Sequence, residues 1–189
     1  MDKAQRMISA DNKDAIDFLD FWLSAGPSKW FSGGEAFDEK CRAYEALWEK
    51  GAAGELDSWA DTASGALSLI ILLDQIPRNI FRGDAKQFST DAKALDLARM
   101  AIEHGYDKTQ MMPTRNFFYL PFMHSEDMAD QQLCCDLLRP LNSREHYYFA
   151  LVHMDAIARF GRFPHRNKML GRDTTEAERA YMKSGGFRA

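Results

Sequence analysis

Arginine and histidine side chains gather in the segment RFGRFPHRNKMLGR, which spans residues 159–172. A guanidinium group is a planar fork that suits a carboxylate or phosphate group, and it also stacks on aromatic rings. Phe160 and Phe163 lie between the arginines and argue against the alternative interpretation, a fully solvated basic loop. The segment therefore predicts a site for an anionic ligand. Its candidate binding residues are Arg159, Arg162, His165, Arg166, Asn167 and Arg172.

A second polar motif, LDQIPRNIFR at residues 73–82, follows a run of almost wholly apolar residues. Asp74 is expected at a helix C-terminus, where a carboxylate opposes the helix dipole, and half buried. Such a carboxylate needs a cationic partner, and Arg78 and Arg82 lie one and two turns further on. The motif is thus either a buried structural ion pair or part of the same anion site. In the second case its binding residues are Asp74, Gln75, Arg78, Asn79 and Arg82.

A third motif, PFMHSE at residues 121–126, places His124 and Glu126 around an expected helix start. A helix N-terminus presents free N–H donors to an anion, and a histidine there can carry a proton near neutral pH. The alternative is a helix cap beside a buried, hydrogen-bonded histidine. Both residues are therefore candidates for ligand binding. The candidate catalytic residues are His124, Glu126 and His165.

Helices are expected to position these motifs, because helix start and stop residues recur along the chain. The apolar run at residues 66–73 predicts a buried helix that Pro77 ends or kinks. A second proline, Pro121, is expected to close the aromatic stretch before the third motif. Ser125 is expected to cap the following helix, and the sequence TEAE at residues 175–178 fits a capping box.

The overall pattern predicts an all-α protein. An apolar stripe at residues 37–48 predicts one helix that begins near Gly34 and ends before Gly51. No window of four to eight residues shows convincing strand alternation. We therefore expect about eight or nine helices joined by short connections, with antiparallel helix pairs as the natural arrangement.

Length and composition favour one globular domain over residues 1–189. Hydrophobic residues make up 46% of the chain and charged residues 28%, which is ordinary for a folded protein that needs no disulfide or metal. Cys41, Cys134 and Cys135 are expected to be reduced, with a redox pair of the adjacent two as the weaker alternative. The longest apolar run is far shorter than the ~20 residues of a membrane span, and no secretory signal is recognisable. A soluble, cytoplasmic protein is expected.

The net charge of −4 is unevenly spread along the chain. Residues 139–189 hold ten Lys and Arg residues against five Asp and Glu residues, a net charge of +5. Because the rest of the chain is acidic, nucleic-acid binding by the whole protein is disfavoured, while the basic end can attract a small anion. Glycine-rich phosphate loops and metal-binding motifs are missing from the sequence. No cofactor and no metal are therefore expected.

The strings LDQIPRN at residues 73–79, LPFMHSED at residues 120–127 and RFGRFPHRNKMLGR at residues 159–172 resemble a family of uncharacterised, mainly bacterial proteins. The third string is long and unusual enough to be specific, and the likeness extends over nearly the whole chain. The family is classed as a domain of unknown function, and the resemblance implies a compact, tetratricopeptide-like α-α superhelix. It implies no particular activity.

The leading functional hypothesis is a binding protein with an Arg/His-lined pocket for an anionic small molecule or an acidic peptide end. The alternative is an enzyme that acts on an anionic metabolite, with His124 or His165 as general acid or base and Glu126 as its orienting partner. Nucleic-acid binding and a purely structural role are weaker alternatives, and the oligomeric state stays open. The pocket would be formed by Arg78, Arg82, His124, Arg162, His165 and Arg166.

Two substitutions separate the functional from the structural interpretation. Replacing Arg162 with Ala is expected to weaken anion binding and leave the melting temperature nearly unchanged. Replacing Asp74 with Ala is expected to destabilise the fold, because it leaves a buried arginine without a counter-charge.

Overall fold

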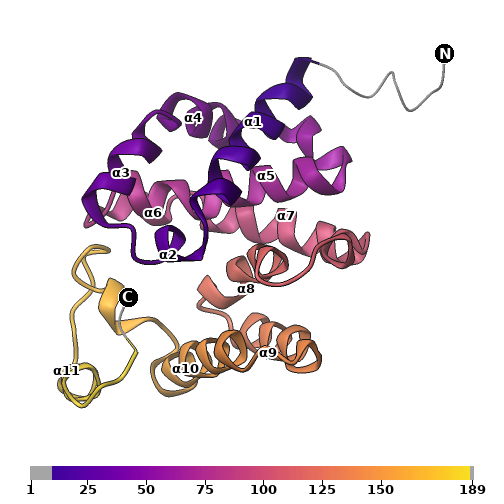
Figure 1. Ribbon diagram of the computed structural model, residues 1–189. Helices are drawn as coiled ribbons and strands as arrows, with labels where there is room; N and C mark the ends of the chain where they lie inside the picture. The colour runs from indigo at the N-terminus through magenta and orange to yellow at the C-terminus, as the bar shows by residue number, and fades with distance from the viewer. Residues whose placement is uncertain (1–9, 188–189) are drawn as a thin grey trace. The chain divides into compact units, whose positions relative to one another are not determined.

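The computed structural model describes residues 10–187, with side chains from residue 13 onwards. Every regular element in this range is a helix, and no strand occurs in it (Figure 1). The all-α prediction is therefore confirmed, whereas the tetratricopeptide-like arrangement stays a prediction. In chain order the α-helices are α1 (Ala10–Ala25), α2 (Pro27–Trp30), α3 (Gly34–Arg42), α4 (Glu45–Ala53), α5 (Ala63–Asp74), α6 (Ile76–Ile80), α7 (Asp91–Glu103), α8 (Leu120–His124), α9 (Met128–Leu138), α10 (Arg144–Phe160) and α11 (Glu176–Lys183).

Short 3₁₀ helices connect several of these elements. They are η2 (Asp57–Asp61), η3 (Ala85–Phe88), η4 (Tyr106–Thr109), η5 (Thr114–Phe118), η6 (Arg139–Leu141) and η7 (Pro164–Arg166).

The chain divides into two compact units. Unit 1 holds the described residues up to Arg82 together with Lys86–Phe118, and unit 2 holds Gly83–Ala85 together with the described residues from Tyr119 onwards. We describe each unit by itself, and a single domain over the whole chain stays a prediction. None of the helices within residues 10–187 is long and apolar enough to cross a membrane.

Helix α5 is the centre of unit 1. Its residues 66–73 are all buried, as the apolar run predicts, because a helix that is apolar all round must be covered on every side. Thr62 caps its N-terminus by accepting the Gly65 N–H at 3.1 Å. The helix ends at Asp74, and Pro77 then stands in the first turn of α6. Helices α1, α4 and α7 pack against α5.

Buried hydrogen bonds hold two of these neighbours in register with α5. The Ser68 hydroxyl donates to the Ala15 carbonyl of α1 at 2.8 Å. The Thr90 hydroxyl, just before α7, donates to the Leu73 carbonyl at 2.5 Å. Each of these bonds satisfies a polar group in a core where an unpaired one would be costly.

Three local predictions need correction. The helix expected from Gly34 to Gly51 is broken into α3 and α4, because Tyr44 leaves helical geometry and packs its ring against Phe21, with ring centroids 4.5 Å apart. Pro121 opens α8 instead of closing the aromatic stretch, since a proline is well placed in the first helical turn. The cap of α9 is Asp127, whose carboxylate accepts from the Ala129 N–H at 2.7 Å.

Unit 2 is built from α9 packed on α10, with α8 against both. Helix α11 contacts η7 and starts with the predicted capping box, in which Thr175 accepts the Glu178 N–H and Glu178 accepts the Thr175 N–H. Phe163, Ala156 and Ile157 form a small buried cluster within the unit. The loop between α10 and α11, residues 161–175, carries most of the Arg/His segment at residues 159–172.

Candidate functional site

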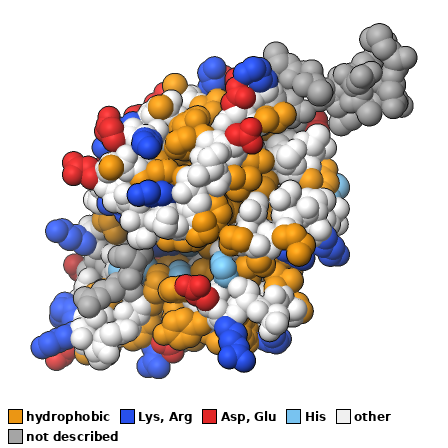
Figure 2. Space-filling model, in the orientation of Figure 1, with side chains coloured by type: hydrophobic (Ala, Val, Ile, Leu, Met, Phe, Trp, Pro, Cys, Tyr) orange, Lys and Arg blue, Asp and Glu red, His pale blue; other side chains and the backbone are white. Residues whose placement is uncertain are grey.

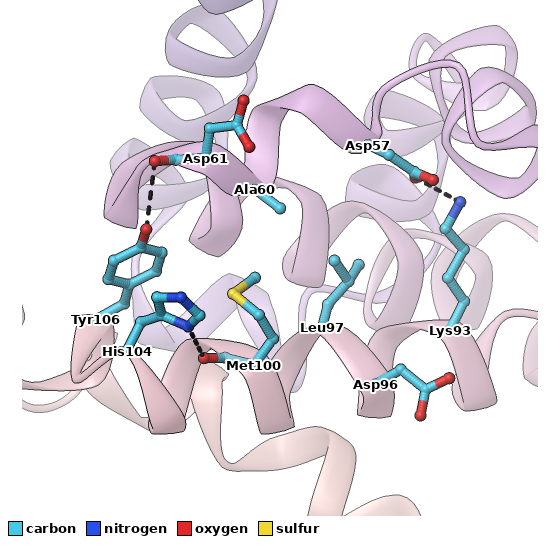
Figure 3. A pocket seen from close by; sticks show the side chains of 9 residues that line it. All are labelled: Asp57, Ala60, Asp61, Lys93, Asp96, Leu97, Met100, His104 and Tyr106. Carbon is cyan, nitrogen blue, oxygen red and sulfur yellow. Dashed lines mark hydrogen bonds and ion pairs between the residues drawn. The ribbon is translucent and has the colours of Figure 1, made fainter.

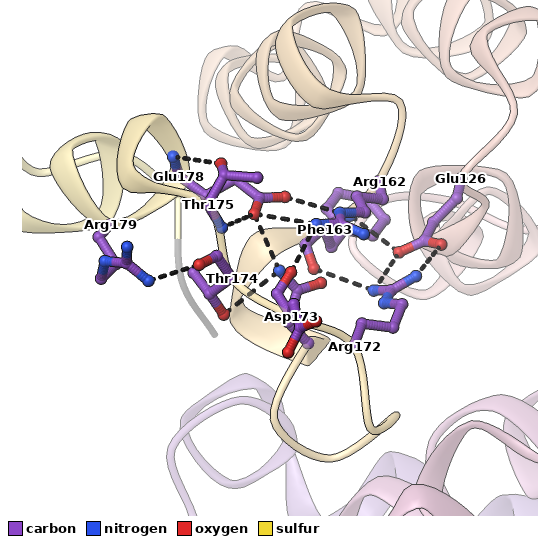
Figure 4. Close-up of polar contacts among 10 residues, drawn as sticks. Glu126, Arg162, Phe163, Arg172, Asp173, Thr174, Thr175, Glu178 and Arg179 are labelled. Carbon is purple, nitrogen blue, oxygen red and sulfur yellow. Dashed lines mark hydrogen bonds and ion pairs between the residues drawn. The ribbon is translucent and has the colours of Figure 1, made fainter.

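The Arg/His segment of unit 2 is held by ion pairs to its own acids. Arg162 Nε donates to Glu178 Oε1 at 2.6 Å, and Arg162 Nη2 donates to Glu178 Oε2 at 3.0 Å (Figure 4). A further bond joins Arg162 Nη2 to the Asp173 carbonyl at 2.8 Å. This two-point contact is the geometry that an external carboxylate would otherwise take up.

Glu178 is the buried centre of this network. It is 1% exposed and also accepts from Asn167 Nδ2 at 3.2 Å and from the Thr175 N–H at 2.7 Å. The Arg162 guanidinium, with help from the Asn167 and Thr175 donors, lowers the pKa of the Glu178 carboxyl to about 2. The carboxylate therefore stays ionised at neutral pH and ties α11 to the loop before it.

A second ion pair of the same type ends in Glu126. Arg172 Nη1 donates to Glu126 Oε2 at 2.7 Å, and Arg172 Nη2 donates to Glu126 Oε1 at 3.0 Å (Figure 4). The Phe163 N–H adds a bond to Glu126 Oε1 at 2.8 Å. Burial works to raise the pKa of Glu126, but these donors outweigh it, and the pKa lies below its usual value. Both carboxylate oxygens of Glu126 are thus already hydrogen-bonded within the protein, to the Arg172 guanidinium and the Phe163 N–H.

Three imidazole groups of unit 2, those of His124, His153 and His165, lie in an aromatic cluster. The His153 ring lies 3.8 Å from that of Phe187 and 6.3 Å from that of His124, measured between centroids. The His165 ring lies 5.6 Å from Phe163, and Arg166 stacks over the same phenyl ring at 4.5 Å. His153 Nδ1 bonds to the Phe149 carbonyl at 2.7 Å. These contacts resemble a packed core more closely than an open site.

Burial controls the charge of two of these histidines. Loss of solvation, with smaller effects from neighbouring cationic groups, lowers the pKa of His153 to about 3 and that of His165 to about 4. Both rings are therefore neutral at pH 7. A base with a pKa near 4 takes up a proton only weakly at neutral pH, which reduces the value of His165 as a general base.

These two depressed pKa values predict that the protein loses stability in mild acid. The unfolded chain binds protons at the ordinary pKa of 6.5, so it gains protons before the folded chain does. The free energy of unfolding is then expected to fall from about pH 6.5 down to pH 4 for His165 and pH 3 for His153, by roughly 2 kcal/mol for each of the two histidines at pH 5. Urea unfolding at pH 7.5 and pH 5 measures the difference.

Replacing His165 with Gln provides the control, since a glutamine cannot titrate. The variant is expected to lose about 2 kcal/mol less than the wild type between pH 7.5 and pH 5. An identical loss in both proteins would show that His165 is not protonated on unfolding in this range.

In unit 1, the motif around Asp74 forms an ion-pair network across helices. Asp74 is 1% exposed, and its Oδ1 lies 3.4 Å from Arg78 Nη1 while its Oδ2 accepts from Gln75 Nε2 at 2.6 Å. Arg78 Nη1 and Nη2 also donate to Asp91 Oδ1 and Oδ2, at 2.8 and 3.0 Å. The guanidinium therefore joins the end of α5 to the start of α7.

Two further arginines of the motifs, Arg82 and Arg159, are paired as well. Arg82 Nε donates to Asp38 Oδ2 of α3 at 2.8 Å, and Arg82 Nη2 donates to Asp38 Oδ1 at 2.9 Å. Asn79 donates to the Gln75 carbonyl at 3.1 Å, which supports the turn between α5 and α6. Arg159 pairs with Asp155 one turn earlier on α10, at 2.8 Å.

Five arginines among the predicted ligand-binding residues are thus bound to carboxylates of the chain itself. Their donors face acids that already satisfy them, so an external anion would have to displace an internal one. The motif at residues 73–82 lies in unit 1, whereas the motifs at residues 121–126 and 159–172 lie in unit 2. Convergence of all three on one pocket stays a prediction. The five residues are Arg78, Arg82, Arg159, Arg162 and Arg172.

A pocket that sequence reasoning missed lies in unit 1, among α1, α2 and α3. It has a volume of about 420 Å³, within the range of small-molecule sites. We call it the lysine pocket, because Lys29 and Lys40 line it and have no ion-pair partner among the described residues. Its other lining residues are Phe21, Ser24, Ala25, Ala36 and Phe37.

Local geometry holds the lysine pocket open. The Trp30 indole N–H donates to the Trp22 carbonyl at 2.6 Å and so fastens α2, which carries Lys29, to α1. Gly33 lies so close to Phe37 that an added Cβ would stand 2.6 Å from that of Phe37. Only glycine permits this approach of the turn to α3. The Phe21 and Phe37 rings stack at 6.0 Å with 10° between their planes.

A larger pocket of about 590 Å³ lies between η2 and α7 in the same unit.

Groups of three or more His, Cys, Asp or Glu side chains suited to a metal ion are absent from the described part of the chain.

The fold and these sites define an all-helical protein in which five motif arginines are held in internal ion pairs and two lysines, Lys29 and Lys40, line a pocket. Residues 18–186 match the family described as bacterial protein of unknown function (DUF924), and the chain belongs to this family. It is also similar to a solved structure of a protein of unknown function from Agrobacterium tumefaciens. The two share 45% sequence identity and a TM-score of 0.88, over 92% of this chain and 99% of the other. Among curated proteins, none matches the chain.

Proposed function

We propose that the chain is a binding protein for a small organic anion, which binds in the lysine pocket. The observation that carries the proposal is the pair of lysines, Lys29 and Lys40, that line this pocket without an acidic partner. An ammonium group without a counter-charge attracts an anion, and two of them facing one hollow attract it together.

The lysine pocket supplies donors but few acceptors. The Ser24 hydroxyl already donates to the Asp20 carbonyl, so it adds no free donor. The two ammonium groups are the remaining donors, and they suit a carboxylate or a phosphate. The proposed ligand is therefore still an anion, as the Arg/His motifs predict. Its binding residues are now Lys29 and Lys40, whose charges form no ion pair among the described residues.

Aromatic and small apolar side chains make up most of the lining of the lysine pocket. Phe21 and Phe37 present stacked rings, and Ala25 and Ala36 are too small to fill the space above them. A ligand with a flat apolar body would bury its rings against the phenyl groups and place its charge at the lysines. An aromatic carboxylate has this combination.

Removing the two lysine charges tests the proposal. We expect 2-naphthoate to bind the wild-type protein, as followed by its fluorescence, and the double variant Lys29→Met, Lys40→Met to bind it at least tenfold more weakly. The expected size follows from about 1 kcal/mol for each solvent-accessible charge pair. Methionine keeps the length and apolar stem of lysine, so the fold is expected to be unchanged.

Two controls separate charge from general adhesion. The neutral analogue 2-naphthamide should bind the wild type as weakly as 2-naphthoate binds the double variant. Replacing Lys183, an exposed lysine of α11, with Met should leave binding unchanged. Equal affinity of the wild type and the double variant for 2-naphthoate would refute the proposal.

The two other functional hypotheses have less support. For the enzyme, Glu126 binds Arg172 and the Phe163 N–H, and the pKa of His165 is about 4. For nucleic-acid binding, the face in Figure 2 shows acidic and basic side chains intermixed, whereas a nucleic acid requires a continuous basic surface.

A further inference from the structure

The larger pocket of unit 1 has the opposite chemistry to the lysine pocket. We call it the acceptor pocket. It lies between η2 and α7, with Leu97 and Met100 rising from α7 towards Ala60 of η2 (Figure 3). Polar residues surround this apolar floor. They are Asp57, Asp61, Lys93, Asp96, His104 and Tyr106.

The hydrogen-bond donors of the acceptor pocket are used inside the protein. Lys93 Nζ pairs with Asp57 Oδ1 at 2.7 Å and donates to the Gly51 carbonyl at 2.9 Å. The Tyr106 hydroxyl donates to the Asp61 carbonyl at 3.3 Å (Figure 3). The single cation and the single hydroxyl of the pocket therefore already have partners.

The histidine of the acceptor pocket also presents an acceptor. His104 Nδ1 lies 2.8 Å from the Met100 carbonyl oxygen. Because a carbonyl can only accept, Nδ1 must carry the proton, and in the neutral ring Nε2 is left as an acceptor. The hydrogen bond of His104 Nδ1 is thus made to a carbonyl four residues earlier in the chain, and it requires no ligand.

The groups of the acceptor pocket that have no ion-pair partner within residues 10–187 are negative or acceptor in character. The carboxylates of Asp61 and Asp96 form no ion pair among the described residues, whereas that of Asp57 is neutralised by Lys93. A ligand that matches these groups must donate hydrogen bonds and carry positive charge. It must also present an apolar stem to Leu97 and Met100.

We propose that the acceptor pocket is a second binding site, independent of the lysine pocket, for an alkylguanidinium or alkylammonium group. The aliphatic stem lies over Leu97 and Met100, and the cationic end reaches the carboxylate of Asp61 at the η2 side of the pocket or that of Asp96 at the α7 side. An arginine side chain of a peptide and a free guanidine both offer this chemistry. A stem of three or four methylene groups is long enough to bury apolar surface while its head stays at the polar margin.

A pair of isosteric ligands tests the charge requirement. N-acetylarginine N-methylamide is expected to bind the wild-type protein in a calorimetric or NMR titration, and the citrulline analogue, which has the same shape without the charge, is expected to bind at least fivefold more weakly. Agmatine serves as the free guanidine. Tighter binding of agmatine than of the amino-acid derivative would assign the site to a free guanidine, and the reverse order would assign it to a peptide side chain.

Variants locate the binding. The double variant Asp61→Asn, Asp96→Asn is expected to lose at least tenfold in affinity for N-acetylarginine N-methylamide, while Asp14→Asn, at an exposed acid of α1, is expected to lose none. Both asparagines keep the shape of the aspartates they replace, and the melting temperature checks that the fold is intact. Equal affinities of the double variant and the wild type, or equal binding of the citrulline analogue, would overturn the proposal. Binding of 2-naphthoate in the same double variant should be unchanged, so failure here leaves the lysine pocket unaffected.

Discussion

Replacing Arg162 with Ala is expected to lower the free energy of unfolding by about 3 kcal/mol. The reason is Glu178, which is 1% exposed and would keep a buried negative charge without its two-point partner. Asn167 and the Thr175 N–H would still bind Glu178 Oε2, but Oε1 would lose its short bond from Arg162. Urea unfolding followed by fluorescence measures the loss. This result reverses the expectation from sequence that the substitution leaves stability unchanged.

A neighbouring arginine provides the control for this substitution. Arg159 also pairs with an aspartate, but both side chains of that pair are largely exposed, at 59% and 43%. Replacing Arg159 with Ala is expected to cost less than about 1 kcal/mol, because solvent screens the charges. Equal losses for the two variants would show that the burial of Glu178 contributes nothing to the Arg162 interaction.

Replacing Asp74 with Ala is expected to lower the free energy of unfolding by about 2–3 kcal/mol. The carboxylate is buried at the end of α5, and its removal leaves the Gln75 amide without an acceptor and brings Arg78 to a single acidic partner. Loss of one member of a buried pair commonly costs about 3–5 kcal/mol. The smaller value is expected here because Asp91 still binds Arg78.

The pair of Lys13 and Asp17 on α1 is the matched control for Asp74. It has the same spacing of four residues, but its side chains are 73% and 59% exposed. Asp17→Ala is therefore expected to change the stability by less than about 0.5 kcal/mol. A loss of less than 0.5 kcal/mol for Asp74→Ala would contradict a stabilising role for the network at the end of α5.

Local patterns in the sequence were enough to predict much of the fold. The apolar run of residues 66–73 predicted the buried helix, and Pro77 and the Thr175 capping box predicted where elements end or begin. These features depend on residues within one or two turns of each other. The break at Tyr44 was missed because the ring packs against Phe21 of another helix, and no local spacing indicates that contact.

The candidate site was harder to predict, because the charge of an arginine says nothing about which carboxylate neutralises it. Arg172 binds Glu126, which lies 46 residues earlier in the chain, and Arg82 binds Asp38, which lies 44 residues earlier. The sequence alone did not distinguish guanidinium groups that face an open pocket from guanidinium groups that are paired with distant carboxylates. Lys29 was missed for the opposite reason, since an isolated lysine attracts no notice until the fold leaves it without a partner beside a pocket.

The most direct test of the proposed function is to map where an organic anion binds, by recording amide NMR shifts during a titration with 2-naphthoate. We expect saturable shifts centred on α1, α2 and α3, with the largest at Ser24, Ala36 and Lys40. Shifts centred on residues 159–172 would return the site to the Arg/His segment. That outcome, or the lack of any saturable shift, would contradict binding in the lysine pocket.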